Sequence, residues 1–423
     1  MRDEHLSLEA LASWLSGDLP YEDLQRHVIP HFLAHCPSCH QRYEEILRLQ
    51  QEVEHWNEVI AVNEGLRAPE QLARLAELPF EERLERIDQD GELQTWGLCQ
   101  LLLKRSLEAA LADPAEAVSF AELGVRIADL LPGEAYDPHW VSDLRAKCWA
   151  YLGNARRVLG ELWSADEAFR RSDSFLATST TGNLKVRAEV YDLKASLRRG
   201  QRRFGEAVAL LDQAIDFFRE LGDLHRVGRS LINKASVLEE QGEFEPAIGF
   251  LHEASPLLDP LREPRLIFCS HLNLVALLIA AGRYEGAEEA LPELRRVALD
   301  QRNPLDLVRV AWAEGRIAFG LGRLGAAEAS FREVQREFFE RGMGYDAALV
   351  SLDLAMLYAQ EGCTAELKQL AAELLPVFES REVHREAMAA LLMFQHAAEE
   401  ETLTLELARH LAEFLKRERR RTT

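Results

Sequence analysis

The stretch Arg229–Pro260, RSLINKASVLEEQGEFEPAIGFLHEASPLLDP, contains two helical patterns separated by Gly242. Apolar and small residues recur at helical spacing on both sides of this glycine: Leu231, Ala235 and Leu238 before it, and Ala247, Leu251, Ala254 and Leu258 after it. Glycine after a helix readily takes the left-handed conformation that ends it. The alanines leave room for close approach, so the stretch predicts two packed helices joined by a tight turn.

This turn glycine recurs along the chain with a nearly fixed spacing. Gly242, Gly282, Gly322 and Gly362 follow one another at 40 residues, and Gly200 and Gly160 extend the series by steps of 42 and 40. The residues five positions after the last four glycines are Ala247, Ala287, Ala327 and Leu367. A repeat of this length indicates stacked copies of one helical unit, each burying its apolar side against its neighbours. We therefore expect an all-α fold, an α-solenoid, with function on an extended surface rather than in a buried cleft.

The units resemble the tetratricopeptide repeat over roughly residues 140 to 378. That family has a small residue in its first helix, glycine at the turn, an aromatic residue two positions on, and a small–bulky–small pattern in its second helix. The period of 40 exceeds the 34 residues of the family's unit, so we expect longer helices or connections. The resemblance implies an α-solenoid of tetratricopeptide-like helix pairs that binds a protein or peptide.

The positions where the repeat pattern begins and ends predict the domain boundaries of the chain. We expect a small helical domain at residues 1–52, a linker at 53–80, a divergent helical pair at 81–138, the repeats at 139–380 and capping helices at 381–418. Terminal units of repeat arrays are commonly atypical because their outer faces meet water.

Composition narrows the function classes. The net charge of -22 argues against direct nucleic-acid binding, because such a chain repels phosphate. The one basic run, Lys416–Arg421, suits the negative end of a last helix. We find no signal peptide and no apolar stretch long enough to span a membrane, and four of the six cysteines fit helix interiors rather than a disulfide framework. These features favour the cytoplasm.

Residues 27–40, HVIPHFLAHCPSCH, differ in kind from the repeats. Cys36 and Cys39 form a Cys-x-x-Cys motif, and His27, His31, His35 and His40 surround it. Two thiolates at this spacing can hold one ion, and Zn²⁺ takes four tetrahedral nitrogen or sulfur ligands. Closing such a site can contribute on the order of 10 kcal/mol to the folding of a small domain.

The whole N-terminal segment resembles the zinc-binding anti-sigma domain of bacteria. The residues that carry this resemblance are His5-Leu6-Ser7, Trp14-Leu15-Ser16-Gly17-Asp18-Leu19, His31 and Cys36-Pro37-Ser38-Cys39. The resemblance implies Zn²⁺ as cofactor and the ligands His5, His31, Cys36 and Cys39. The chain departs from the family by having four residues rather than three between His31 and Cys36, so His35 or His27 could substitute for His31.

Two other interpretations of the motif stay open. A redox-active Cys-x-x-Cys would need a neighbouring strand, and no strand pattern is visible. Alternatively the zinc site has decayed, and apolar residues alone hold the domain: Leu11, Trp14, Leu15, Val28, Ile29 and Leu33.

In a superhelix of this kind the first helix of each pair lines the concave side. We expect the following partner-binding positions there: Asn154, Arg157, Asp192, Asn233, Asn273, Arg309, Arg316 and Asp353. Asn233 and Asn273 hold the same position in adjacent repeats, so their amides could bind a peptide backbone. Alternatively, they bond neighbouring helices or water. Because Leu352 and Met356 are apolar, an internal helix could instead fill part of the channel.

No local arrangement of nucleophile, base and oxyanion donors, and no glycine-rich phosphate loop, is visible in the sequence. We therefore interpret the chain as a non-enzymatic regulatory or adaptor protein. Its repeats would bind a protein or peptide, and its zinc module could contact a transcription factor, such as a sigma factor. One alternative is a scaffold with a zinc-stabilised cap, and another is an enzyme or small-molecule receptor with a site between helices.

Overall fold

The computed structural model describes residues 37–110, 112–133, 135–179, 182–373, 392–394, 396–398, 400 and 403–422. Within these ranges, the side chains of residues 37–40, 43–58, 373 and 416–422 lie outside the description. Every regular element in the described ranges is a helix, which confirms the all-α prediction. None of the described helices is long and apolar enough to cross a membrane.

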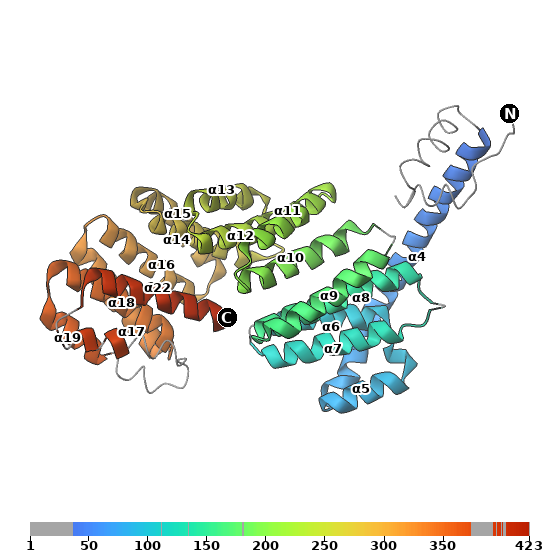
Figure 1. Cartoon of the computed structure of the whole chain (residues 1–423), viewed down its shortest axis with the longest axis horizontal. Helices are drawn as coiled ribbons and strands as arrows, with labels where there is room; N and C mark the ends of the chain where they lie inside the picture. The colour runs from blue at the N-terminus through green and yellow to red at the C-terminus, as the bar shows by residue number, and fades with distance from the viewer. Residues whose placement is uncertain are drawn as a thin grey trace. The chain divides into compact units, whose positions relative to one another are not determined.

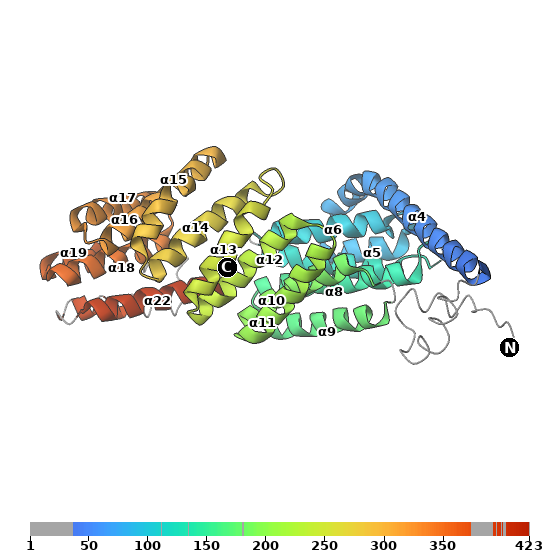
Figure 2. The ribbon, with the colours of Figure 1, turned by 90° about the horizontal axis from the view of Figure 1, so that it is seen from above.

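Contacts divide the chain into two compact units, residues 1–201 and 202–423. The helices of the first unit are α4 (Pro37–Ala76), α5 (Phe80–Gln89), α6 (Trp96–Ala109), α7 (Pro114–Leu130), α8 (Pro138–Val158), α9 (Leu162–Thr178) and α10 (Leu184–Gly200), with the short η2 (Gly91–Leu93). Each of α6, α7 and α8 packs on the next helix (Figure 1), and α4 packs on α6 (Figure 2). The single helix α4 runs through the expected boundary at residue 52 and most of the expected linker, 53–80.

The second unit continues the same pattern. Its helices are α11 (Phe204–Glu220), α12 (Leu224–Gln241), α13 (Phe244–Ala254), α14 (Pro264–Ala280), α15 (Tyr284–Gln301), α16 (Pro304–Gly320), α17 (Leu324–Glu340), α18 (Gly344–Glu361), α19 (Thr364–Glu373) and α22 (Leu405–Thr422), with the short η3 (Ser255–Leu257). Consecutive helices pack on one another as a solenoid, and α22 returns to lie beside α18 (Figure 1). We call the first and second helices of each pair the A and B helices; α12, α14, α16 and α18 are A helices.

The turns between A and B helices confirm most of the glycine series and correct one member. Gly242, Gly282, Gly322 and Gly362 all have positive φ, between 73° and 80°, and Gly160 has φ 90°. Gly200 does not continue the series, because it still belongs to α10, and Arg202 takes the left-handed conformation with φ 59°. The chain reaches this turn two residues later than Gly200 suggested, and Arg202 lies 40 residues before Gly242.

A second series marks the turns between successive pairs. Gly182, Gly222 and Gly342 have φ between 61° and 69°, and Arg302 has φ 53° at the corresponding position. These turns therefore also recur with the repeat, which the sequence interpretation did not recognise.

Close packing within each pair depends on small residues. Ala247, Ala287 and Ala327 are completely buried, as their position after the turn glycine predicts. Gly315 of α16 lies so close to Phe331 of α17 that an added Cβ would come within 2.7 Å of the ring. Gly153 of α8 has the same relationship to Phe169 of α9, at 2.8 Å. Both phenylalanines are fully buried, so in these two pairs a ring of the B helix packs directly against the backbone of the A helix.

Candidate partner-binding face

The A helices of the second unit carry a row of polar side chains at related repeat positions. Asn233, Asn273 and Asp353 hold one position on α12, α14 and α18, and α16 has Ala313 there. Arg309, Trp312 and Arg316 flank Ala313 on α16. We call the row the A-helix face; it comprises Asn233, Asn273, Arg309, Trp312, Arg316 and Asp353.

At one end of α16, a buried carboxylate holds two arginines. Asp306 is 0% exposed and lies in the first turn of α16, where the positive end of the helix dipole favours an anion. Its carboxylate accepts a hydrogen bond from Arg265 of α14 and pairs with Arg309 Nη1 at 3.3 Å. Burial raises the pKa of the neighbouring Cys269 thiol, although Arg265 and Arg309 act in the opposite direction. Asp306 therefore fixes the position of Arg309.

Two turns further along α16, a second buried carboxylate does the same for Arg316. Asp353 of α18 is 2% exposed. Its Oδ2 accepts a hydrogen bond from Trp312 Nε1 at 2.6 Å and lies 3.6 Å from Arg316 Nε. Trp312 also packs edge-on against Phe338, with 5.8 Å between ring centroids. The indole and the guanidinium are thus held before any partner arrives.

Both carboxylates accept a hydrogen bond from a residue 41 positions away, which is one repeat plus one residue. Arg265 contacts Asp306, and Trp312 contacts Asp353, each across two successive A helices. The sequence interpretation named Arg309, Arg316 and Asp353 but missed Arg265, Asp306 and the polar role of Trp312. The signal that could have found them is this 41-residue spacing between complementary groups.

The two asparagines of the A-helix face are less deeply buried than Asp306 and Asp353. Asn233 and Asn273 are both partly buried, and they lie one repeat apart on α12 and α14. Asn233 has a polar contact of its own. Their position fits either role that the sequence left open.

The remaining three predicted positions, Asn154, Arg157 and Asp192, lie in the first unit. Asn154 is buried on α8, where its Oδ1 accepts hydrogen bonds from Arg157 Nε at 3.2 Å and Nη2 at 3.1 Å. Burial lowers the pKa of Arg157 to about 10, and the nearby Arg199 acts in the same direction. Asp192 is partly buried on α10. Asn154 is thus engaged by its own helix.

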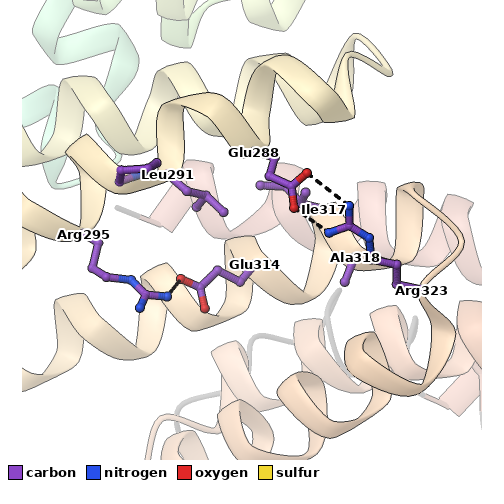
Figure 3. A pocket seen from close by; sticks show the side chains of 8 residues that line it. Glu288, Leu291, Arg295, Glu314, Ile317, Ala318 and Arg323 are labelled. Carbon is purple, nitrogen blue, oxygen red and sulfur yellow. Dashed lines mark hydrogen bonds and ion pairs between the residues drawn. The ribbon is translucent and has the colours of Figure 1, made fainter.

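A pocket of about 480 Å³ lies between α15 and α16 (Figure 3). Leu291, Pro292, Ile317 and Ala318 contribute its apolar lining. Arg323 pairs with Glu288, and Arg295 pairs with Glu314, so that an ion pair flanks the apolar lining on each side (Figure 3). The four charged side chains are between 29% and 58% exposed, so these pairs add little stability.

The pocket and the A-helix face lie on different sides of α16. At about 100° per residue, Arg309 and Arg316 are separated by only ~20° around the helix axis. Glu314 and Ala318, which line the pocket, each lie about 160° from Arg316. A change at the pocket therefore leaves the A-helix face intact, which provides a matched control for experiments.

The zinc site predicted at His5, His31, Cys36 and Cys39 falls outside the described part of the chain. The first three residues precede residue 37, and Cys39 lies in α4 with its side chain among those not described. Among the described residues, no group of three or more His, Cys, Asp or Glu side chains is suited to a metal ion. The zinc site stays a prediction.

Comparison with known proteins identifies the fold of the chain but assigns it to no family. No known protein family and no curated protein matches the sequence. Among solved structures, the chain resembles the apo form of RapI (TM-score 0.53, 14% identity, 88% of this chain and 97% of that chain). It also resembles aspartyl phosphate phosphatase F from Bacillus subtilis (TM-score 0.51, 13% identity, 90% and 96%).

A third resemblance is to a signal transduction ATPase with numerous domains from Pyrococcus horikoshii, which has a tetratricopeptide repeat sensor. The TM-score is 0.51 at 16% identity, over 81% of this chain and 50% of that chain. At these identities the likeness concerns the fold alone. The chain therefore has a tetratricopeptide-like repeat fold.

Proposed function

We propose that the chain is a non-enzymatic adaptor that binds a peptide or an extended segment of a protein on the A-helix face. The observation that carries this proposal is the way buried carboxylates hold Arg309, Trp312 and Arg316 in place. Holding such groups in advance lowers the entropy lost on binding.

The chemistry of the face suits a polypeptide backbone and its carboxylates. A guanidinium carries five N–H donors, so Arg309 and Arg316 keep groups that a carbonyl or carboxylate can accept from. Their side chains are 23% and 27% exposed, which leaves them accessible. They lie seven residues apart on α16, about 10 Å along the helix, which an extended segment of about three residues spans.

The experiment that tests this proposal is affinity capture of binding partners, in which the wild-type chain is compared with two variants. We expect Arg309→Ala with Arg316→Ala to lose a partner that the wild type captures. The control Arg295→Ala changes a residue of α15 that lines the pocket and pairs with Glu314, and it should keep the partner. Loss of the partner in both variants, or in neither, would argue against the A-helix face.

We propose separately that residues 1–52 bind Zn²⁺ and contact a transcription factor. The donor set supports the metal, since two thiols with nearby imidazoles are the ligands that Zn²⁺ prefers. The resemblance to anti-sigma domains supports the partner class. The full chain should capture a sigma factor, and Cys36→Ser with Cys39→Ser should abolish that capture. Capture that survives these changes would contradict the proposal that the zinc-bound module contacts the transcription factor.

A further inference from the structure

The first unit contains a small pocket of about 230 Å³, apart from all of the positions discussed above. It lies among α6, α8 and the start of α10. We call it the tryptophan pocket, after Trp96 and Trp140 in its lining; the other lining residues that matter here are Asp143, Lys147, Lys185 and Glu189. On α8 the lining residues are three and four positions apart, as one helix face requires.

The aromatic wall is rigid. The indoles of Trp96 and Trp140 stack with 3.5 Å between centroids and 5° between planes. Tyr136 Oη accepts a hydrogen bond from the Trp96 main-chain N–H at 3.3 Å and donates one to Glu64 Oε1 at 2.6 Å. Trp96 is buried, whereas Trp140 is partly exposed. A group that enters the pocket therefore meets an aromatic surface already held in position.

Buried charges converge on the same space. Asp143 is 2% exposed and accepts a hydrogen bond from Ser179 Oγ at 2.6 Å. Glu189 is 4% exposed and its Oε2 lies 3.0 Å from Lys147 Nζ. Lys147 also donates to Gln100 Oε1 at 3.1 Å. Taking charged groups out of water is unfavourable. A few polar groups that converge on a cavity with aromatic lining are typical of a binding site.

The balance of charge indicates the sign of the ligand. Among the described lining residues, the carboxylates of Asp143 and Glu189 are buried, whereas the ammonium of Lys147 is 16% exposed and pairs with Glu189. Lys185 is exposed at the start of α10, where water screens its charge. A positively charged group that enters the pocket therefore lies beside two buried carboxylates. Aromatic rings also attract cations through their electron-rich faces.

We propose that the tryptophan pocket binds a small organic cation, with an ammonium, quaternary ammonium or guanidinium group against Trp140 and beside the carboxylates of Asp143 and Glu189. The pocket is smaller than the ~300–1,000 Å³ typical of sites for drug-sized ligands. It accommodates one such group, free or at the end of a longer molecule, rather than a folded peptide. This site lies in the first unit and is independent of the A-helix face.

The experiment is isothermal titration calorimetry of the full chain with four probes. These are choline, the neutral isostere of choline in which carbon replaces nitrogen, arginine amide, and succinate as an anion. We expect saturable binding of choline or arginine amide, and binding of the neutral isostere at least about tenfold weaker, which corresponds to ~1.4 kcal/mol. Absence of binding by both cations, equal binding of the isostere, or preferential binding of succinate would overturn the proposal.

Variants locate the site. Glu189→Gln removes one buried carboxylate, and Trp140→Leu removes the exposed aromatic surface. We expect each to weaken cation binding about tenfold. The control Glu122→Gln alters a carboxylate of the same unit that pairs with Arg156 at 3.1 Å, outside the pocket, and should bind like the wild type.

Circular dichroism and thermal unfolding report whether each variant is folded. If Glu189→Gln does not fold, Trp140→Leu and Asp143→Asn provide the same test. Unchanged binding by every folded pocket variant would overturn the proposal.

Discussion

Trp312 Nε1 donates a hydrogen bond to Asp353 Oδ2 at 2.6 Å, so that a buried carboxylate of α18 holds an indole of α16. The same carboxylate lies 3.6 Å from Arg316 Nε. One residue of the following repeat thus positions two side chains of the A-helix face. The contact connects neighbouring repeats and prepares the proposed binding surface at once.

Replacing Asp353 with alanine should destabilise the second unit by about 1–3 kcal/mol, because it leaves the N–H of the partly buried Trp312 indole without its acceptor. The measurement is the shift of the thermal or urea unfolding transition. Asp300→Ala is the control, since Asp300 is 66% exposed and forms only a surface pair with Arg296 at 2.8 Å. Equal shifts in the two variants would contradict a structural role for Asp353.

The turn residues give a second prediction. Arg202 has φ 59°, a conformation that costs a residue with a side chain about 1–2 kcal/mol relative to glycine. Arg202→Gly should therefore stabilise the protein by about 1 kcal/mol, and Gly242→Ala should destabilise it by a similar amount. Both changes are read from unfolding transitions.

Gly200→Ala is the control for the corrected repeat series. Gly200 lies in α10, and an added Cβ would meet only Leu162 Cδ2 at 3.9 Å, an ordinary contact. We expect stability to stay the same or rise, because alanine favours helix. A loss comparable to that of Gly242→Ala would mean that Gly200 is the turn residue after all.

Packing within pairs gives a third prediction. Gly315→Ala should destabilise the protein by about 1–3 kcal/mol, since the new Cβ would lie 2.7 Å from Phe331 Cε1. Gly325→Ala is the control, because nothing lies within 4 Å of a Cβ there. A double-mutant cycle with Phe331→Leu should show coupling between positions 315 and 331. Additive effects would show that the ring and Gly315 are independent.

The zinc prediction is tested by metal analysis. The full chain, purified with zinc and then dialysed, should retain one zinc ion per chain, and Cys36→Ser with Cys39→Ser should release it. Cys269→Ser is the control for thiol number, because Cys269 lies in α14, far along the chain from the motif. Zinc-free wild-type protein, or equal zinc in all three proteins, would contradict the prediction.

The sequence allowed prediction of the repeat but not of its lateral contacts. Gly242 and Ala247 carry strong local constraints, a left-handed turn and a fully buried small side chain, so their spacing reveals the helix pairs. Arg202 escaped notice because arginine in that conformation is tolerated rather than preferred. The error at Gly200 has the same origin.

The site was harder to predict because it depends on how successive A helices are staggered. Arg316 and Asp353 were named as separate groove positions, yet they form one ion pair with Trp312 beside them. Similarly, Trp96 and Trp140 stack across two helices that no repeat signal aligns. Such contacts follow from packing between elements, which periodicity along one helix does not determine.

The most direct test of the account is a photo-crosslinking amino acid placed at position 273 or at position 295, which leaves Arg309 and Arg316 unchanged. Position 273 lies on the A-helix face, and position 295 lies at the α15–α16 pocket. The account predicts that a captured partner crosslinks from position 273 and not from position 295. Crosslinking from position 295 alone, or equally from both positions, would contradict it.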